Sequence, residues 1–335
     1  MFKYIVKRLA ISIIILLGVS VIIYSMVRLM PNDYVDTKYA SQLQSGAITL
    51  DDIAHFKSLY GIGDNSFKGI VGGYFKWIGN LAQGDLGNSF KYEKPVGQVI
   101  SENMWISFAI AVVATVLQFV ISVPLGISSA THQYSIRDYA VTFFTMIGIS
   151  LPTYFFAAIV VKIFAVDLEI FPPSGLLSAT ANYPDGFAGE MQKLLDIAHH
   201  LFLPILVSVL LSIGGLMRYT RTNMLEVLNA DYIRTARAKG LSEKTVIYKH
   251  AFRNTMIPLV TMLAGILPSL FGGMMITEQV FGIDGIGRLA YQALREGDIP
   301  FVMGYNMFLA VLTVIGTLLS DIMYSVVDPR VKLGK

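Results

Sequence analysis

The fold class is decided by long apolar stretches, the first of which is LAISIIILLGVSVIIYSMVRL, residues 9–29. A helix rises about 1.5 Å per residue, so a bilayer core of about 30 Å requires roughly 20 apolar residues. The stretch meets this requirement and follows a basic head with Lys3, Lys7 and Arg8. No small-x-small cleavage site follows it, so we interpret it as an uncleaved membrane anchor rather than a signal peptide.

Similar stretches recur along the rest of the chain, which is 54% hydrophobic and 15% charged. We therefore predict an all-α polytopic membrane protein with six transmembrane helices. The remaining predicted spans are Trp105–Ala130, Tyr139–Val166, Leu201–Met217, Met256–Phe281 and Phe301–Val327.

The chain divides into three predicted parts: residues 1–30 with the head and first span, an external segment 31–104, and a five-helix part 105–335. Within the external segment, Thr49 and Asp52 have the spacing of a capping box, so we expect short helices there.

Basic residues in the loops predict the orientation, because Lys and Arg near a span are retained in the cytoplasm. The N-terminal head, the segment 218–255 and the tail from Arg330 to Lys335 carry the basic charge, whereas the loop 167–198 is acidic. Both termini are therefore predicted to lie in the cytoplasm.

Several classes of chemistry have no sequence support. The chain has no Cys, no GxxxxGK[ST] phosphate loop and no HExxH motif, so we expect no catalytic residue, cofactor site or metal site. His199 and His200 are adjacent on a predicted helix, point in different directions and are interpreted as an interfacial polar pair. A net charge of +3 gives no reason to expect nucleic acid as a partner.

The longest predicted cytoplasmic loop is RYTRTNMLEVLNADYIRTARAKGLSEKTVIYKHAFRNTMIP, residues 218–258. Gly240 interrupts it and Ser242 follows in a position to cap a second helix, so two helices joined by a bend are predicted. One interpretation is a pair of surface helices on anionic lipid headgroups. The other is a rigid protrusion that contacts a partner protein.

Several segments resemble the permeases of ATP-binding-cassette (ABC) importers, in particular the first of the two permeases in dipeptide, oligopeptide and nickel importers. The general pattern of that superfamily is Glu-Ala-Ala, three residues, then Gly; here only Ala236 and Gly240 match it, and Arg234 and Thr235 depart from it. The version here is similar to that of the peptide and nickel branch. The similar segments are GDLGNSF (84–90), DYIRTARAKGL (231–241), HAFRNTMIP (250–258), VFGIDGIGRL (280–289) and DIMYSVVDPRVK (321–332).

The resemblance implies a type I ABC importer permease fold in a bacterial inner membrane. It also implies a second related permease, two cytoplasmic ATPase subunits that bind ATP and Mg, an extracytoplasmic solute-binding protein and a peptide substrate. The loop would dock on one ATPase, with Gly240 permitting the bend and with Arg234 and Arg237 bonding to partner carboxylates. The predicted docking residues are Asp231, Tyr232, Arg234, Thr235, Ala236, Arg237, Gly240 and Leu241.

Charged residues near the spans need partners, because an unpaired charge in hydrocarbon is costly. We expect Asp321 to pair with Arg218 or Arg221 at the inner ends, the alternative being a role in the transport pathway. Glu278, near the outer end of the fifth predicted span, is a candidate to face a water-filled vestibule and a peptide amino terminus.

Three alternatives remain open. The same machine could carry nickel chelates or another small solute. A stand-alone channel or secondary transporter would be expected to show paired intramembrane charges and an inverted repeat, and neither is visible. An intramembrane enzyme would need a cluster of catalytic groups that the sequence does not show.

Overall fold

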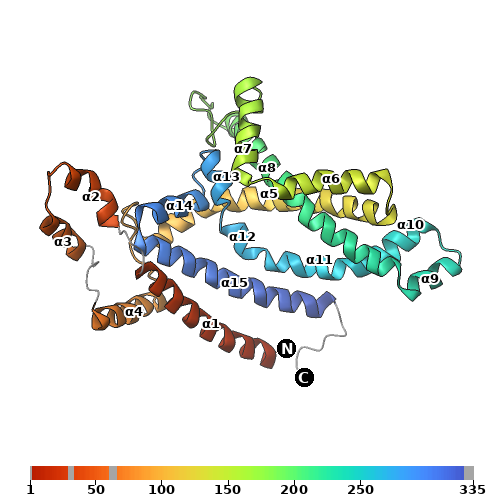
Figure 1. Ribbon diagram of the computed structural model, residues 1–335, viewed down its shortest axis with the longest axis horizontal. Coiled ribbons are helices and arrows are strands. Elements are labelled where there is room, and N and C mark those ends of the chain that lie inside the picture. Colours follow the sequence, from red (N-terminus) through yellow and green to blue (C-terminus); the bar gives the residue numbers. More distant parts are fainter. Residues whose placement is uncertain (1, 29–33, 60–65, 328–335) are drawn as a thin grey trace.

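The computed structural model describes residues 2–28, 34–59 and 66–327, and these form helices joined by loops (Figure 1). Within those ranges there is one isolated β-bridge, between Asn88 and Pro95, and no β-strand. The all-α prediction is confirmed for this part of the chain. The predicted basic tail from Arg330 to Lys335 lies outside the described residues.

The helices follow one another along the chain with two π-helical segments between them. In order they are α1 (Phe2–Arg28), α2 (Tyr34–Gln44), α3 (Leu50–Leu59), α4 (Phe67–Ala82), α5 (Val96–Thr131), α6 (Ile136–Ser150), α7 (Thr153–Val161), η1 (Lys162–Asp167), α8 (Phe187–Leu228), α9 (Asp231–Ala238), α10 (Glu243–Thr245), η2 (Val246–Phe252), α11 (Arg253–Gly265), α12 (Leu267–Phe271), α13 (Met275–Val280), α14 (Ile286–Glu296) and α15 (Ile299–Val327).

Four helices are long and apolar enough to cross a bilayer: α1, α5, α8 and α15. They correspond to the first, second, fourth and sixth predicted spans. All four are longer than predicted. The difference is largest for α5, which begins at Val96 rather than at Trp105, and for α8, which extends well beyond Leu201–Met217 at both ends.

The third predicted span is not straight. It consists of α6 followed by α7 and η1, and the two halves are bent by 101°. Leu151 has extended backbone angles (φ −88°, ψ 131°) because the following Pro152 disfavours the helical conformation of its predecessor. Counted as one bent span, this pair brings the number of candidate crossings among the described residues to five.

The fifth predicted span, Met256–Phe281, is helical but interrupted. It is divided into α11, α12 and α13, and Gly273 between the last two has φ +73°. A single continuous helix over this stretch was therefore the wrong prediction. The break brings the start of α13 against α14.

The helices pack mainly along one direction, as Figure 1 shows for α1, α5 and α15. α5 packs along α8, α6 along α8, and α15 along both α1 and α11. Helix α9 lies at one end of the long axis, and α2, α3 and α14 lie toward the other; α1 starts near the middle, and both its start and the end of α15 are the ends of those helices nearer α9. α7 rises across this direction.

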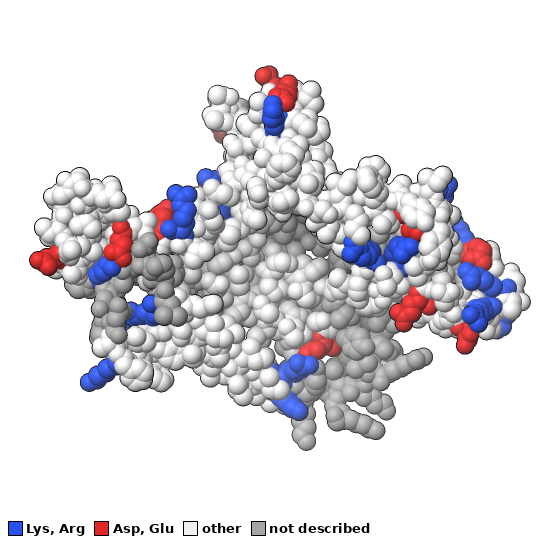
Figure 2. Space-filling view, viewed as in Figure 1, with Lys and Arg blue, Asp and Glu red and all other residues white. Residues whose placement is uncertain are grey.

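Charge is distributed in agreement with that arrangement. Figure 2 shows Lys, Arg, Asp and Glu gathered at both ends of the long axis, near the end of α7 and in a smaller group at the lower edge, with much of the surface between these groups uncharged. The described residues include large exposed apolar side chains, among them Ile14 in α1 and Phe143 and Phe144 in α6. Such a band is typical of helices in contact with lipid or with other membrane helices.

The segment predicted to be external, residues 31–104, contains the expected short helices in its described part. Thr49 and Asp52 form the predicted capping box: the Thr49 N–H donates to Asp52 Oδ2 (2.8 Å) and the Asp52 N–H donates to Thr49 Oγ1 (3.3 Å). The Thr49 N–H and the Thr49 hydroxyl both donate to the Asp52 carboxylate and lower its pKa. The sequence therefore predicts the start of α3 correctly.

Candidate functional site

Helix α9 forms at the end of the long axis because the backbone turns sharply on both sides of it. Ala230 is extended before its first residue, and Gly240 after its end has φ +76°, a conformation that side chains with a Cβ disfavour. Ser242 Oγ accepts from the Thr245 N–H (3.4 Å) and so begins α10. The predicted pair of helices joined by a bend is confirmed.

One face of α9 is buried against the membrane helices. Ile233 is fully buried and Ala236 nearly so, three residues apart on the same side of the helix. They belong to one apolar cluster with Ile127 of α5, Met224 of α8 and Val246 of η2. α9 is therefore seated on three elements at once, and a displacement of those elements would carry α9 with it.

The other face of α9 is exposed to solvent. Of the residues predicted to dock on a partner, only Ala236 is buried; the others are exposed, namely Asp231, Tyr232, Arg234, Thr235, Arg237, Gly240 and Leu241. The Arg234 guanidinium is 3.6 Å from the Asp231 carboxylate, and both side chains are largely in solvent.

Arg237 has a partner inside the chain. Its Nε donates to Glu243 Oε1 (2.9 Å), an ion pair across the bend that contains Gly240. Ile233 and Glu243 were not among the predicted residues. The signal for Ile233 was present in the sequence, because Ile233 and Ala236 are the apolar positions of an otherwise polar helix and have helical spacing.

The predicted ion pair between Asp321 and Arg218 or Arg221 is wrong. Asp321 Oδ2 lies 3.1 Å from Arg8 Nε instead, because α1 packs along α15. Arg221 binds Asp138, the buried carboxylate at the start of α6, with Nε and Nη2 each 2.9 Å from a carboxylate oxygen.

Asp138 receives further hydrogen bonds from the Ser129 hydroxyl and the Tyr134 N–H. This cluster joins α5, α6 and α8 at the end nearest α9. It fixes the ends of the three helices nearest α9, since a buried carboxylate is stable only when paired and hydrogen-bonded.

The predicted vestibule contact of Glu278 is also wrong, because this side chain is 1% exposed. Its Oε1 accepts from Ser107 Oγ (2.7 Å) and the Met274 N–H (2.9 Å), and its Oε2 accepts from the Arg288 N–H (2.8 Å). Ser107 Oγ in turn accepts from the Ile286 N–H (2.9 Å).

Ile286 and Arg288 lie in the first turn of α14, where backbone N–H groups have no partner within the helix. Glu278 and Ser107 satisfy these groups from other helices. The carboxylate is therefore buried because it completes the start of α14. Glycines make room for it: a Cβ at Gly285 would lie 2.5 Å from the Glu278 carboxylate, and one at Gly287 would lie 2.8 Å from the Met275 nitrogen.

His199 and His200 are occupied by backbone carbonyls. His199 Nε2 is 2.9 Å from the Ile170 oxygen, and His200 Nδ1 is 2.9 Å from the Asp196 oxygen. The Asp196 carboxylate also accepts from the Tyr183 hydroxyl (2.5 Å), which raises the pKa of Tyr183 to about 12. Among the described residues, no group of three or more His, Asp and Glu side chains is placed to hold a metal ion.

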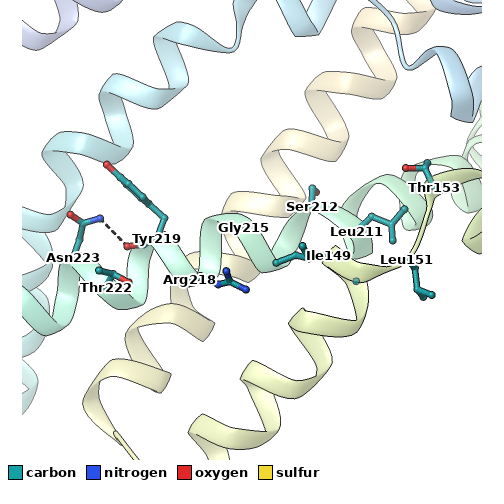
Figure 3. A pocket seen from close by; sticks show the side chains of 11 residues that line it. Ile149, Leu151, Thr153, Leu211, Ser212, Gly215, Arg218, Tyr219, Thr222 and Asn223 are labelled. Carbon is teal, nitrogen blue, oxygen red and sulfur yellow. Dashed lines mark hydrogen bonds between the residues drawn. The ribbon is translucent and has the colours of Figure 1, made fainter.

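A hollow of about 800 Å³ opens between α8 and the bend that joins α6 to α7 (Figure 3). Its walls are apolar at Ile149, Leu151 and Leu211. Its polar part comes from Thr153 at the start of α7 and from α8, with Ser212, Arg218, Tyr219, Thr222 and Asn223. The volume is in the range of small-molecule sites in proteins, about 300–1,000 Å³.

Arg218 lies on the wall of this hollow, beside Gly215 and Ile149 in Figure 3. Its Nη2 is 2.8 Å from the Met146 sulfur. A thioether is a weak acceptor, so this contact leaves most of the hydrogen-bonding capacity of the guanidinium available.

Comparison with known proteins agrees with this architecture. Residues 122–333 match the family described as "Binding-protein-dependent transport system inner membrane component". The oligopeptide transport system permease protein AppB of Bacillus subtilis is 36% identical, and the match covers 99% of this chain and 100% of AppB. The dipeptide transport system permease protein DppB of Alkalihalophilus pseudofirmus is 31% identical, with 99% of this chain and 100% of DppB covered.

A solved structure shares the fold. A chain of the MetNI methionine ABC transporter, in an inward-facing conformation, aligns with a TM-score of 0.51 and 19% identity, covering 69% of this chain and 97% of its own length. The arrangement is that of a type I ABC importer permease. With the family match over most of its length, the chain belongs to the family of inner membrane components of binding-protein-dependent transport systems.

Proposed function

We propose that the chain is one of two related permease subunits of an ATP-driven peptide importer and forms half of its pore. The observation that carries this proposal is helix α9, because it presents an exposed polar face while its buried face is held by α5, α8 and η2. ATP hydrolysis on a partner can move a pore only through such a contact.

The proposed partners are a second permease, two cytoplasmic ATPase subunits that bind ATP and Mg, and an extracytoplasmic solute-binding protein. The chain itself has no phosphate-binding loop and would hydrolyse no ATP. Peptide as the substrate rests on the relatives, since AppB and DppB are named as oligopeptide and dipeptide permeases and match along nearly the whole chain.

The proposed topology has six crossings, with both termini and α9 in the cytoplasm of a bacterial cell. The bent pair α6–α7 and the interrupted segment α11–α13 would be the third and fifth crossings. The start of α1 and the end of α15 are the ends of those helices nearer α9, and the basic segment 218–255 contains α9.

The absence of Cys in the sequence permits a direct test of this topology. Ser45→Cys in the external segment and Lys239→Cys beside α9 each introduce one exposed thiol. A membrane-impermeant maleimide is expected to label Ser45→Cys in intact spheroplasts. It is expected to label Lys239→Cys only after the spheroplasts have been permeabilised. Labelling of both before permeabilisation would contradict the topology.

The function is tested by purifying the tagged chain in mild detergent with the subunits it retains. We expect ATPase subunits to co-purify, and peptide with the solute-binding protein to stimulate ATP hydrolysis and uptake into liposomes. If a nickel chelate stimulated ATP hydrolysis and peptides did not, the substrate would be the nickel chelate rather than a peptide. Uptake by the chain alone, without ATPase subunits, would overturn the importer in favour of a channel or ion-coupled carrier.

A further inference from the structure

The hollow beside α8 is lined by one face of that helix. Gly215, Arg218 and Thr222 follow one another at intervals of three and four residues, and all three are exposed. The neighbouring positions Ser212 and Tyr219 complete the same face. A face that combines small, hydroxyl and cationic residues is poorly suited to lipid tails, so it is expected to border water or a polar ligand.

Two arginines on α8 have opposite surroundings. Arg221 is bound by the buried carboxylate of Asp138 through two hydrogen bonds. Arg218 takes part in no ion pair among the described residues, and its guanidinium contacts the Met146 sulfur. A guanidinium in a membrane protein is expected to have an anionic or water partner, and within this part of the chain Arg218 has no such protein partner.

The position of Arg218 favours a ligand over a lipid headgroup. Asp138 marks the inner end of α6, and Met146 lies about two turns farther along that helix, roughly 12 Å at 1.5 Å per residue. Arg218 reaches Met146, so its side chain extends away from the inner end rather than toward the headgroups. This direction agrees with the general tilt of helical side chains toward the helix N-terminus.

We infer that the hollow is a section of the transport pathway and that Arg218 binds the C-terminal carboxylate of the passing peptide. The inference rests on the proposed function and adds a binding residue and the chemical group it recognises. Arg is suited to this role because its planar donors match a carboxylate. The apolar walls at Ile149, Leu151 and Leu211 would accept varied side chains, so that the invariant terminus, rather than the side chains, is recognised.

The test uses the intact complex in liposomes and trialanine with either a free C-terminal carboxylate or a C-terminal amide. Replacement of Arg218 by Gln removes one charge-assisted contact and is therefore expected to reduce uptake of the free acid about tenfold. Uptake of the amide is expected to change little. Arg218→Lys should restore part of the free-acid uptake. Arg137→Gln is the matched control, because Arg137 is also exposed near the inner end and lies outside the hollow.

A second measurement does not depend on delivery by the solute-binding protein. In the complex, Thr222→Cys places a thiol in the hollow, and this chain has no other Cys. Millimolar trialanine is expected to slow its labelling by a small thiol reagent, whereas the amide should not. In the double variant Thr222→Cys with Arg218→Gln, trialanine should no longer slow the labelling of the thiol.

Three results would overturn the inference. Equal effects of Arg218→Gln on the acid and the amide, or no effect on either, would show that the carboxylate is not recognised. If Arg218→Gln reduced uptake only in liposomes that contain anionic phospholipid, Arg218 would bind a lipid phosphate instead. If the Arg218→Gln chain no longer co-purified with the partner permease, Arg218 would belong to the subunit interface. Failure of the wild-type complex to contain ATPases or transport peptides is a different outcome and would refute the proposed function itself.

Discussion

The α9 region and the cluster around Glu278 lie far apart along the molecule, and they differ in which of their residues are buried. α9 buries two small or medium apolar side chains and leaves its charged residues in solvent. The Glu278 cluster buries its carboxylate completely and surrounds it with glycines and backbone donors. The first arrangement suits a surface that awaits a partner, whereas the second suits a fixed joint between helices α5, α13 and α14.

The largest expected effect is at the fixed joint. Glu278→Ala removes the acceptor of two backbone N–H groups and one hydroxyl, so we expect a loss of about 3 kcal/mol or more in stability. The measurement is the melting temperature of the purified complex in detergent. Asp284→Ala is the matched control, because the Asp284 side chain is 76% exposed in the same loop and its replacement should cost little. Equal melting temperatures for both variants would contradict the role of Glu278.

The next effect is at the seat of α9. Ile233→Ala leaves a cavity in the cluster under α9 and is expected to cost about 2–4 kcal/mol locally. Peptide-stimulated ATPase activity should fall because α9 no longer moves with α5 and α8. Tyr232→Ala removes an exposed neighbour and should leave the melting temperature unchanged. A variant Ile233→Ala with normal stimulation would show that the buried face of α9 does not transmit motion.

A smaller effect is expected at the bend after α9. Gly240 has φ +76°, and no atom lies within 4 Å of the position its Cβ would take, so only backbone conformation opposes substitution. We expect Gly240→Val to cost about 1–2 kcal/mol and Gly240→Asn less, since Asn tolerates this conformation. During purification, Gly240→Val should retain fewer ATPase subunits than Gly240→Asn. Gly79→Ala in α4 is a control, with open space and no positive φ. Equal retention for Val and Asn would contradict the conformational explanation.

The smallest effect concerns the exposed pair of Arg237 and Glu243. Its loss should change stability by less than about 1 kcal/mol, because exposed ion pairs contribute little. Replacing each member of the pair nevertheless distinguishes two roles for Arg237, which are to hold the bend and to contact the partner ATPase. If Arg237 only holds the bend, Arg237→Gln and Glu243→Gln should affect ATPase retention equally. A loss confined to Arg237→Gln would show instead that Arg237 contacts the partner.

Much of the candidate site followed from local sequence. Gly240 and Ser242 predicted the bend and the start of α10, because a positive φ and a capping hydroxyl are local requirements. The predicted ion-pair partners of the charged residues were wrong because those pairs depend on contacts between distant parts of the sequence. Asp321 meets Arg8, and Arg221 meets Asp138, through helix pairs that are far apart in the sequence.

The interruptions of two predicted spans also depended on tertiary structure. Pro152 was visible in the sequence, but a proline in a membrane helix is compatible with a mild kink as well as with a bend of 101°. In α11–α13 the glycines allow the break, and its geometry is stabilised by Glu278 and Ser107 at the start of α14. Those contacts come from separate helices and have no local signature.

The sequence by itself determined the membrane class, the helical secondary structure, the position of α9 and the resemblance to importer permeases. These depend on apolar length, helix caps and short motifs, which are properties of neighbouring residues. Only the tertiary structure decided that Glu278 is buried, that Arg221 is paired and that Arg218 lines a hollow. In a chain that is apolar on nearly every face, hydrophobic periodicity does not fix helix rotation, so packing between distant helices determines which side chains meet.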